Sequence, residues 1–480
     1  MYKRYLLYLS FLLIPTSCTQ DFQEINTNPN APVDVQASLL FRQVQWDFAE
    51  RMSYEGFVAG SLLGQYFTAI DFNLFDRHSL SEPQFGGNPW DFLYTNLRDN
   101  EIVLQKALNN PAFAVYEGPA RILKAYMAQS LTDLFGDVPY TQAVLGKSGT
   151  IAPIYDEQEQ IYTGADGILD QLEKGITALQ EYQGAIPLEG DIIFGGDLKA
   201  WERFANSLKI KVLMRLSNRI SVDNALQAIY DSGNFIQDNS QNASFDFTPG
   251  PPNNFRMSTA RVGDYNLYIM SLTMQEVLEN LEDPRREVFF RPTGNNAMVY
   301  KGLLNGPDAS QLSISVSDFS LSGKIFREEA QQLDANYMNA AETYFFLAEA
   351  AAKGFLNADA QALYEQGVQL AFAYWQSELP LEYLQSGAAA YGQNGADPVE
   401  QILTQKWLNN IGNAYEGWIE FRRTGFPRLK TISASLNNNL IPARMPYPTT
   451  EETLNNNNYT QAATATNGNS INARVWWDIQ

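Results

Sequence analysis

The sequence has one cysteine, Cys18, and one histidine, His78, among its 480 residues. A single cysteine excludes a disulfide framework within the chain and a cysteine-based zinc site. A Ser-His-Asp mechanism would have to use His78, and no cysteine stands near it in the sequence to complete a transition-metal site. We therefore expect no metal and no cofactor, and we interpret His78 as a surface or hydrogen-bonded loop residue.

Runs of basic residues are also missing. The chain has 33 Lys and Arg against 54 Asp and Glu, which gives a formal net charge of −21 at pH 7. Such a chain repels phosphate backbones, whereas nucleic-acid binding needs clustered Lys and Arg. This excludes nucleic acid as a partner, and it makes an anionic membrane surface a poor partner for the folded body.

Residues 1–17 have the pattern of a signal peptide. Lys3 and Arg4 form its positive start, and the apolar stretch that follows is too short to span a bilayer. The sequence Pro-Thr-Ser-Cys then resembles a bacterial lipobox, in which Cys18 is lipidated and becomes the first mature residue, although Pro15 stands where Leu is usual. The alternative is an ordinary signal peptide that contains a chance cysteine. No later stretch is long and apolar enough to predict a transmembrane helix.

Residues 18–35 predict an extended tether, because residues 26–32 are rich in Asn and Pro. The composition, with 45% hydrophobic and 18% charged residues, is that of a globular protein. Large helical folds can reach this length as one unit, so we expect residues 36–480 to form a single domain.

Apolar residues recur at helical spacing along most of the chain, which predicts an all-α, mostly helical fold. The predicted helices cover 36–68, 89–109, 116–135, 165–182, 199–220, 271–281, 337–353, 358–376 and 398–424. Strand patterns are sparse, and we expect short strands at Ala243–Phe247 and Ala297–Tyr300.

Residues 340–372 resemble one degenerate tetratricopeptide repeat. Tyr344, Leu347 and Ala348 occupy the aromatic, leucine and small positions of its first helix, and Ala360 and Tyr364 fit its second helix. A helix pair of this kind cannot bury its apolar face alone, so it must stack on neighbouring helices. The alternative is a generic helical hairpin.

Long stretches rich in Gly, Asn, Pro and Ser separate the predicted helices. Loops of this length inside a compact domain are unusual and are often functional. The stretches cover 69–88, 141–158, 183–197, 237–266, 291–323, 381–397 and 431–470.

Six short stretches, spread from end to end, together resemble a known family. They are DFQEINTNPN (21–30), LFGDVPY (134–140), DPR (283–285), AETYFFLAEA (341–350), RMPYP (444–448) and RVWWD (474–478). Their order and spread are similar to the SusD/RagB outer-membrane lipoproteins, and in particular to the second, more divergent branch.

The resemblance implies a single SusD-like, ligand-binding domain of packed tetratricopeptide-like helix pairs with long irregular loops. It also implies a lipid anchor in the outer membrane, facing outward, and an obligate partner: a SusC-like TonB-dependent β-barrel transporter on which the lipoprotein sits as a hinged lid. Most relatives bind glycans, while the RagB side handles peptides. The expected function is thus capture of a nutrient, an oligosaccharide or else a peptide, without catalysis.

Two other functions compete with this one. A surface glycan-degrading enzyme is disfavoured, because the chain has a single histidine and no recognisable catalytic motif. A pure interaction scaffold remains an alternative, since tetratricopeptide arrays commonly bind proteins and peptides.

Glycan recognition needs flat aromatic faces for sugar rings and polar side chains for the hydroxyl groups, on a largely preformed concave surface. Residues 66–78, with the nearby Trp90, offer this mixture best, and residues 253–266 offer a similar one. A third, weaker candidate is the stretch 391–394. The competing interpretation is that the aromatic residues pack these loops onto the helices. The predicted ligand contacts are Tyr66, Asp71, Asn73, Arg77, Trp90, Arg256 and Tyr265.

Overall fold

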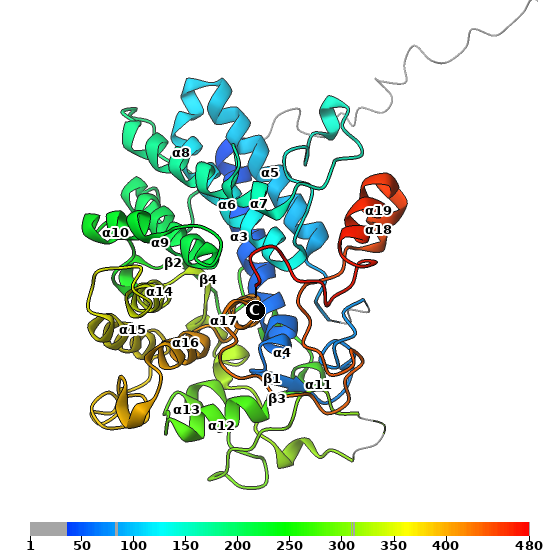
Figure 1. Cartoon of the computed structure of the whole chain (residues 1–480), viewed down its shortest axis with the longest axis vertical. Coiled ribbons are helices and arrows are strands. Elements are labelled where there is room, and N and C mark those ends of the chain that lie inside the picture. Colours follow the sequence, from blue (N-terminus) through cyan, green and yellow to red (C-terminus); the bar gives the residue numbers. More distant parts are fainter. Residues whose placement is uncertain (1–35, 82–84, 309, 311–312, 480) are drawn as a thin grey trace, which may run out of the picture.

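The structure is a computed structural model that describes residues 36–81, 85–308, 310 and 313–479. The predicted signal peptide, the lipidation site Cys18 and the tether 18–35 lie outside the described residues. The described part is mostly helical, with two small two-stranded sheets (Figure 1). The prediction of an all-α fold is therefore confirmed.

The helices and strands follow one another in this order. The α-helices are α3 (Ala37–Glu55), α4 (Ser61–Leu63), α5 (Trp90–Asn109), α6 (Glu117–Phe135), α7 (Gln158–Thr163), α8 (Ile168–Glu181), α9 (Leu198–Leu216), α10 (Asp223–Ser232), α11 (Val262–Tyr265), α12 (Leu272–Asn280), α13 (Arg286–Phe289), α14 (Ala340–Ala352), α15 (Ala360–Tyr374), α16 (Pro398–Asn409), α17 (Glu416–Thr424), α18 (Thr449–Leu454) and α19 (Asn456–Ala465). The short helical turns are η1 (Gly56–Gly60), η2 (Pro111–Tyr116), η3 (Gly146–Ser148), η4 (Asn239–Gln241), η5 (Arg256–Thr259), η6 (Val316–Asp318), η7 (Lys324–Phe326), η8 (Ala330–Gln332) and η9 (Gln393–Gly395). The strands are β1 (Phe67–Ala69), β2 (Ala243–Asp246), β3 (Tyr268–Met270) and β4 (Asp334–Met338).

Helices α8, α9, α14, α15 and α16 follow one another down one side of the molecule (Figure 1). The hairpin of α14 and α15 shows why these residues pair. Asn339 and Asp359 cap the two helices by accepting from the backbone N–H groups of Glu342 and Ala362. A Cβ atom at Gly367 would lie 2.8 Å from the ring of Phe345, so the glycine permits close packing. The tetratricopeptide-like scaffold is confirmed.

The first long helix, α3, continues into a short π-helix, η1. The prediction of one helix over 36–68 is wrong at its end, because α3 passes into η1 and α4, and β1 begins at Phe67. A Cβ atom at Gly56 would lie 2.4 Å from the carbonyl oxygen of Gly412, and one at Gly60 would lie 1.9 Å from that of Ala414. Two glycines thus let the link between α16 and α17 touch the helix backbone directly.

Several other boundaries differ from the sequence pattern. The predicted strand at Ala243–Phe247 is confirmed as β2, which pairs antiparallel with β4. The strand predicted at Ala297–Tyr300 is wrong, because Ala297 and Met298 form a turn and Val299 and Tyr300 have no regular structure. The predicted helix 398–424 divides into α16 and α17, and the predicted loop 431–470 contains α18 and α19.

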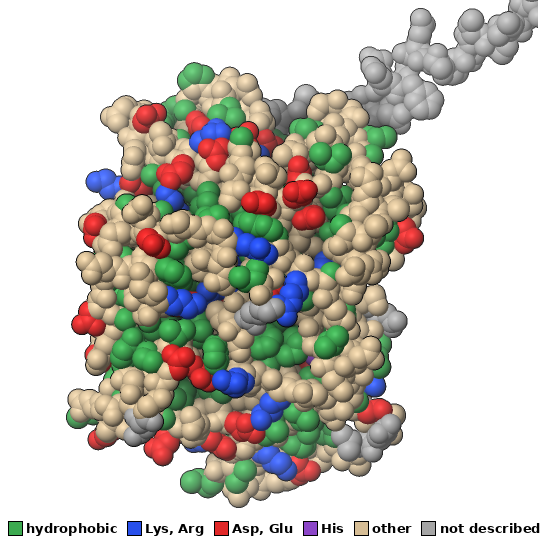
Figure 2. Space-filling model, viewed as in Figure 1, with side chains coloured by type: hydrophobic (Ala, Val, Ile, Leu, Met, Phe, Trp, Pro, Cys, Tyr) green, Lys and Arg blue, Asp and Glu red, His purple; other side chains and the backbone are tan. Residues whose placement is uncertain are grey.

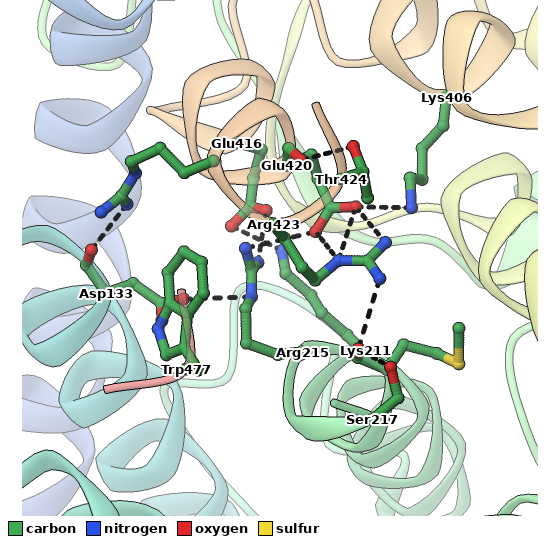
Figure 3. Close-up of polar contacts among 12 residues, drawn as sticks. Asp133, Lys211, Arg215, Ser217, Lys406, Glu416, Glu420, Arg423, Thr424 and Trp477 are labelled. Carbon is green, nitrogen blue, oxygen red and sulfur yellow. Dashed lines mark hydrogen bonds and ion pairs between the residues drawn. The ribbon is translucent and has the colours of Figure 1, made fainter. Parts of the chain in front are cut away.

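A network of buried charges lies between several helices (Figure 3). We call it the central ion network; its members are Asp133, Lys211, Arg215, Glu342, Glu349, Lys406, Glu416, Glu420 and Arg423. These side chains come from α6, α9, α14, α16 and α17, and all are buried. Nearby, the indole N–H of Trp477 donates to Asp133 over 2.7 Å. The network therefore ties together helices that lie far apart in the sequence.

The balance between burial and pairing decides the pKa of each of these carboxylates. Burial alone would raise the pKa of Glu349, but the nearby Arg423 and Lys406 hold it well below its usual range. At Asp133 burial prevails instead and raises the pKa. Glu349 lies 2.6 Å from Arg423 and 3.0 Å from Lys406. Removing one partner from such a network leaves a buried charge uncompensated, which is strongly destabilising.

Candidate ligand-binding site

Three of the predicted ligand contacts are buried packing residues. Tyr66 is 2% exposed and stacks on Trp407 with ring centroids 4.5 Å apart. Trp90 is buried against Phe135 at 4.9 Å. Tyr265 is also buried, and its hydroxyl donates to a backbone carbonyl over 2.8 Å. Because these side chains present almost no surface, the competing packing interpretation describes them, and we remove them from the candidate site.

Asn73 and Arg77 hold the shape of the loop 69–88. The buried Asn73 amide donates to the carbonyl oxygen of Ala69 over 3.0 Å and to that of Pro307 over 2.6 Å. The half-buried Arg77 donates through Nε to the carbonyl oxygen of Ala434 over 2.8 Å. Both side chains therefore connect the loop to other segments, and a ligand contact by either one stays a prediction.

Arg256 lies on η5, in the second predicted region. Its guanidinium pairs with both carboxylate oxygens of Glu50, at 2.9 and 2.6 Å, and lies 4.6 Å from the ring centre of Tyr54. A guanidinium held in this way is well oriented and still half exposed. A ligand contact by Arg256 stays a prediction.

A buried carboxylate organises the base of the loop 69–88. Asp76 accepts from the hydroxyl of Thr68 over 2.7 Å and from the backbone N–H of Ala69 over 3.2 Å. It also accepts from the side-chain amide of Asn305 over 2.7 Å and from the backbone N–H of Gly306 over 2.8 Å. One side chain thus fixes the end of β1, the loop and the 305–306 segment relative to one another.

A third segment closes the base. The backbone N–H of Ser433 donates to the carbonyl oxygen of Asn305 over 2.8 Å, and that of Leu436 donates to the carbonyl oxygen of Arg77 over 2.7 Å. The buried His78 lies 3.1 Å, through Nδ1, from the carbonyl oxygen of Leu440. The interpretation of His78 as a hydrogen-bonded loop residue is therefore confirmed, and the site is built from three segments that are distant in the sequence.

Two phenylalanines stand exposed on this base. Phe72 is 56% exposed and Phe85 is 36% exposed, and their rings meet edge to face with centroids 5.9 Å apart. Phe72 also has a positive φ of 48°, which is unusual for a bulky residue, and its backbone N–H donates to the exposed carboxylate of Asp71 over 2.8 Å. An exposed aromatic side chain on strained backbone indicates a functional surface. We call Phe72 and Phe85 the aromatic pair.

The sequence stretch 66–78 contained Phe72, but the pattern gave no reason to prefer it over its buried neighbours. Phe85 joins it through a second buried carboxylate. Glu55, at the end of α3, accepts from the backbone N–H of Gly87 over 2.7 Å and also from the hydroxyl of Tyr415. Long-range contacts of this kind leave no local signal in the sequence.

Burial sets unusual acidities beneath the aromatic pair. Burial raises the pKa of Asp76 to about 6, although its four hydrogen-bond donors partly oppose the shift. Burial lowers the pKa of His78 to about 4, so the ring is neutral at physiological pH. Burial also raises the pKa of Glu55. Within the described residues, no group of three or more His, Cys, Asp or Glu side chains could hold a metal ion.

Two pockets lie on other parts of the surface. One, of about 820 Å³, lies between α5 and residues 144–147 and is mainly apolar, with Ile102, Phe113 and Leu145 among its lining residues. The other, of about 630 Å³, lies between α12 and α16 and is more polar. The acidic and amide-rich base of the loop 69–88 belongs to neither. Figure 2 shows one face of the molecule, on which acidic and basic side chains are interspersed with apolar ones.

Solved structures share the fold over nearly the whole chain. A chitin-binding protein has a TM-score of 0.76 and 23% identity, with 92% of this chain and 99% of that chain covered. A chitin-binding SusD homologue from Flavobacterium johnsoniae has a TM-score of 0.75 and 20% identity, with 92% and 97% covered. A SusD homologue from Bacteroides fragilis has a TM-score of 0.77 and 24% identity, with 93% and 99% covered.

Residues 29–448 match the second SusD-like family, which is described as starch-binding and associating with the outer membrane. Since the match spans most of the sequence, the chain belongs to this family, as the resemblance implied. This is a family of nutrient-binding proteins associated with the outer membrane and not of enzymes. Among curated proteins no match is found. Across the described residues, no helix has the length and hydrophobicity needed to cross a membrane.

Proposed function

We propose that this protein is a cell-surface lipoprotein that captures an oligosaccharide on the aromatic pair and delivers it to a SusC-like TonB-dependent transporter. The exposed aromatic pair on its hydrogen-bonded base carries the proposal. A sugar ring stacks on a flat aromatic face, and a preformed surface spares the entropy of ordering the site at binding. The chitin-binding relatives suggest β-linked amino sugars as the first ligands to test.

Attachment to the membrane follows from the sequence. Lipid on Cys18 anchors the chain in the outer membrane with the binding surface facing outward, and the residues after Cys18 act as a tether. The transporter is the partner, and the lipoprotein closes over it as a lid, so that ligand binding favours the closed state. A palmitate label that is incorporated into the native chain and lost in Cys18→Ala tests the anchor. Recovery of a large barrel with the detergent-solubilised native protein tests the partner.

Ligand capture is tested by calorimetric titration of residues 19–480 with chitohexaose, maltoheptaose and a mixed peptide library. We expect a glycan to bind and to be recovered uncleaved. Phe72→Ala should weaken this binding about tenfold or more, since stacking of a ligand ring on one aromatic side chain contributes roughly 1–3 kcal/mol. Leu381→Ala, which removes another exposed apolar side chain, is the matched control and should bind normally.

The outcomes separate the alternatives. Binding of peptides in place of glycans would support the RagB-like importer component. New reducing ends in the glycan samples would support an enzyme. Glycan binding that Phe72→Ala leaves unchanged would remove the aromatic pair from the site.

A further inference from the structure

The backbone that carries the aromatic pair is held by hydrogen bonds to two buried carboxylates, and neither phenylalanine side chain takes part in them. Phe72 and Phe85 touch each other, but each belongs to backbone that is held from below by a buried carboxylate. Asp76 lies four residues after Phe72, and Glu55 reaches Gly87, two residues after Phe85. The two carboxylates thus act at the two ends of the same loop.

We propose that Asp76 and Glu55 are the positioning residues of the ligand loop, which set the geometry of the aromatic pair without touching the ligand. This inference rests on the proposed function. Asp76 makes the larger contribution, because its two oxygens join three pieces of chain: β1, the loop and residues 305–306. Glu55 connects the far end of the loop to α3 and, through Tyr415, to the start of α17.

The hydrogen-bond inventory shows why a carboxylate is needed at residue 76. Oδ2 accepts from Thr68, Ala69 and Gly306, and Oδ1 accepts from the amide of Asn305. Four donors converge on one side chain, and an ionised carboxylate is an acceptor at both oxygens. An asparagine would turn an NH₂ group towards one of these donors. Since an unsatisfied buried donor is costly, the loop would have to rearrange.

Asn305 limits that rearrangement. Its Nδ2 donates both to Asp76 and to the carbonyl oxygen of Phe67 over 2.8 Å, while its buried Oδ1 has no hydrogen-bond partner within the described residues. In Asp76→Asn the Asn305 amide could flip to accept from the new NH₂, but it would then abandon Phe67 on β1. The substitution therefore loosens the base of the loop whichever way the amides turn.

The test compares Asp76→Asn with Asp334→Asn. Asp334 is a carboxylate on β4 whose pKa burial likewise raises, and it is hydrogen-bonded to Tyr374 outside the loop. Hydrogen–deuterium exchange comes first, because it needs no ligand. In Asp76→Asn we expect faster exchange at the amides of Ala69 and Gly306 and through the loop, with α6 and α9 unchanged; Asp334→Asn should leave the loop unchanged. Unaltered exchange at Ala69 and Gly306 in Asp76→Asn would overturn the proposal.

A double-mutant cycle with Phe72→Ala then measures whether Asp76 affects glycan binding through Phe72. Asp76→Asn should weaken glycan binding about tenfold in the native background, which is the scale of losing hydrogen bonds to a charged group. In the Phe72→Ala background it should change binding less than about twofold, because the ring that it positions is gone. A general loss of structure would give additive effects, and additive effects would overturn the proposal. If the native protein binds no glycan, the proposed function fails, while the exchange data still decide the positioning role.

Discussion

The central ion network and the base of the ligand loop both bury carboxylates, yet the pKa of Glu349 in the network and that of Asp76 beneath the loop shift in opposite directions. In the network, Arg423 and Lys406 contact Glu349 directly and keep its pKa low despite burial. Beneath the loop, neutral donors surround Asp76, and its pKa rises to about 6. Close contact with two cations keeps Glu349 ionised across a wide pH range, whereas hydrogen bonds from neutral donors leave Asp76 able to titrate near neutral pH.

The strongest challenge to this comparison is to remove a carboxylate from the network. Glu349→Ala leaves Arg423 and Lys406 buried with less compensation, so we expect the free energy of unfolding to fall by about 3–5 kcal/mol. Urea unfolding followed by circular dichroism measures the change. Glu328→Ala, which breaks the exposed pair with Arg291, is the control and should cost less than about 1 kcal/mol. Equal effects of the two substitutions would show that burial does not govern these pairs.

His78 gives the next largest effect. Its pKa falls to about 4 in the folded state from an ordinary 6.5, so the unfolded chain binds a proton first as the pH drops. Its contribution to stability is therefore present above pH 6.5 and is lost as the pH falls through about 4. Asn is tolerated at the positive φ of this residue, so His78→Asn is a suitable substitution. Between pH 7 and pH 4, the free energy of unfolding should fall by about 3 kcal/mol less in His78→Asn than in the native protein. Urea midpoints for both proteins at several pH values measure it, and parallel pH profiles would refute the prediction.

Asp76 should titrate with the opposite sign. Its folded pKa lies above the ordinary value of 3.8, so the folded chain binds a proton first. The contribution is fully present below about pH 3.8 and is lost as the pH rises through about 6. When the pH is lowered from 7 to 4, the free energy of unfolding of the native protein should rise by about 2–3 kcal/mol relative to that of Asp76→Asn. The same urea series measures it, with Asp71→Asn as an exposed control on the same loop, and a relative loss on acidification would contradict the assignment.

The smallest expected change in stability is that of Phe72→Asn, which also tests the role of the exposed ring in binding. Asn tolerates positive φ better than Phe does, so Phe72→Asn should raise the free energy of unfolding by about 0.5 kcal/mol while it weakens glycan binding at least tenfold. Thermal unfolding and titration on the same samples check both. Leu381→Asn, at an exposed apolar side chain outside the candidate site, serves as the control that should not change binding. A loss of stability in Phe72→Asn would mean that the ring serves packing instead of capture.

The sequence predicted the scaffold well, because helices obey a local rule. The apolar spacing found the helices that became α5, α6, α8 and α9 within a few residues, and the capped hairpin at 340–374 matched the repeat pattern. Helix breaks were harder to predict. The π-helix η1 contains Gly56 and Gly60, and these glycines lie against the backbone of the link between α16 and α17, more than 350 residues later in the chain. No local pattern predicts such a contact.

For the candidate site, the sequence indicated a segment and not the individual side chains. The stretch 66–78 is the one that carries an exposed aromatic ring, but the side chains chosen within it, such as Tyr66, are buried by partners more than 300 residues away. Phe72 and Phe85 were not chosen, since exposure depends on how three distant segments meet. Asp76 and Glu55 were missed for the same reason: each is an ordinary acidic residue until the fold brings its donors to it.

The two glycines of η1 have a further consequence. A methyl group at Gly60 would push against Ala414, the neighbour of the tyrosine that holds Glu55, and Glu55 in turn holds the loop at Gly87. A substitution at Gly60 would thus be transmitted through Tyr415 and Glu55 to the loop at Gly87, which lies two residues after Phe85.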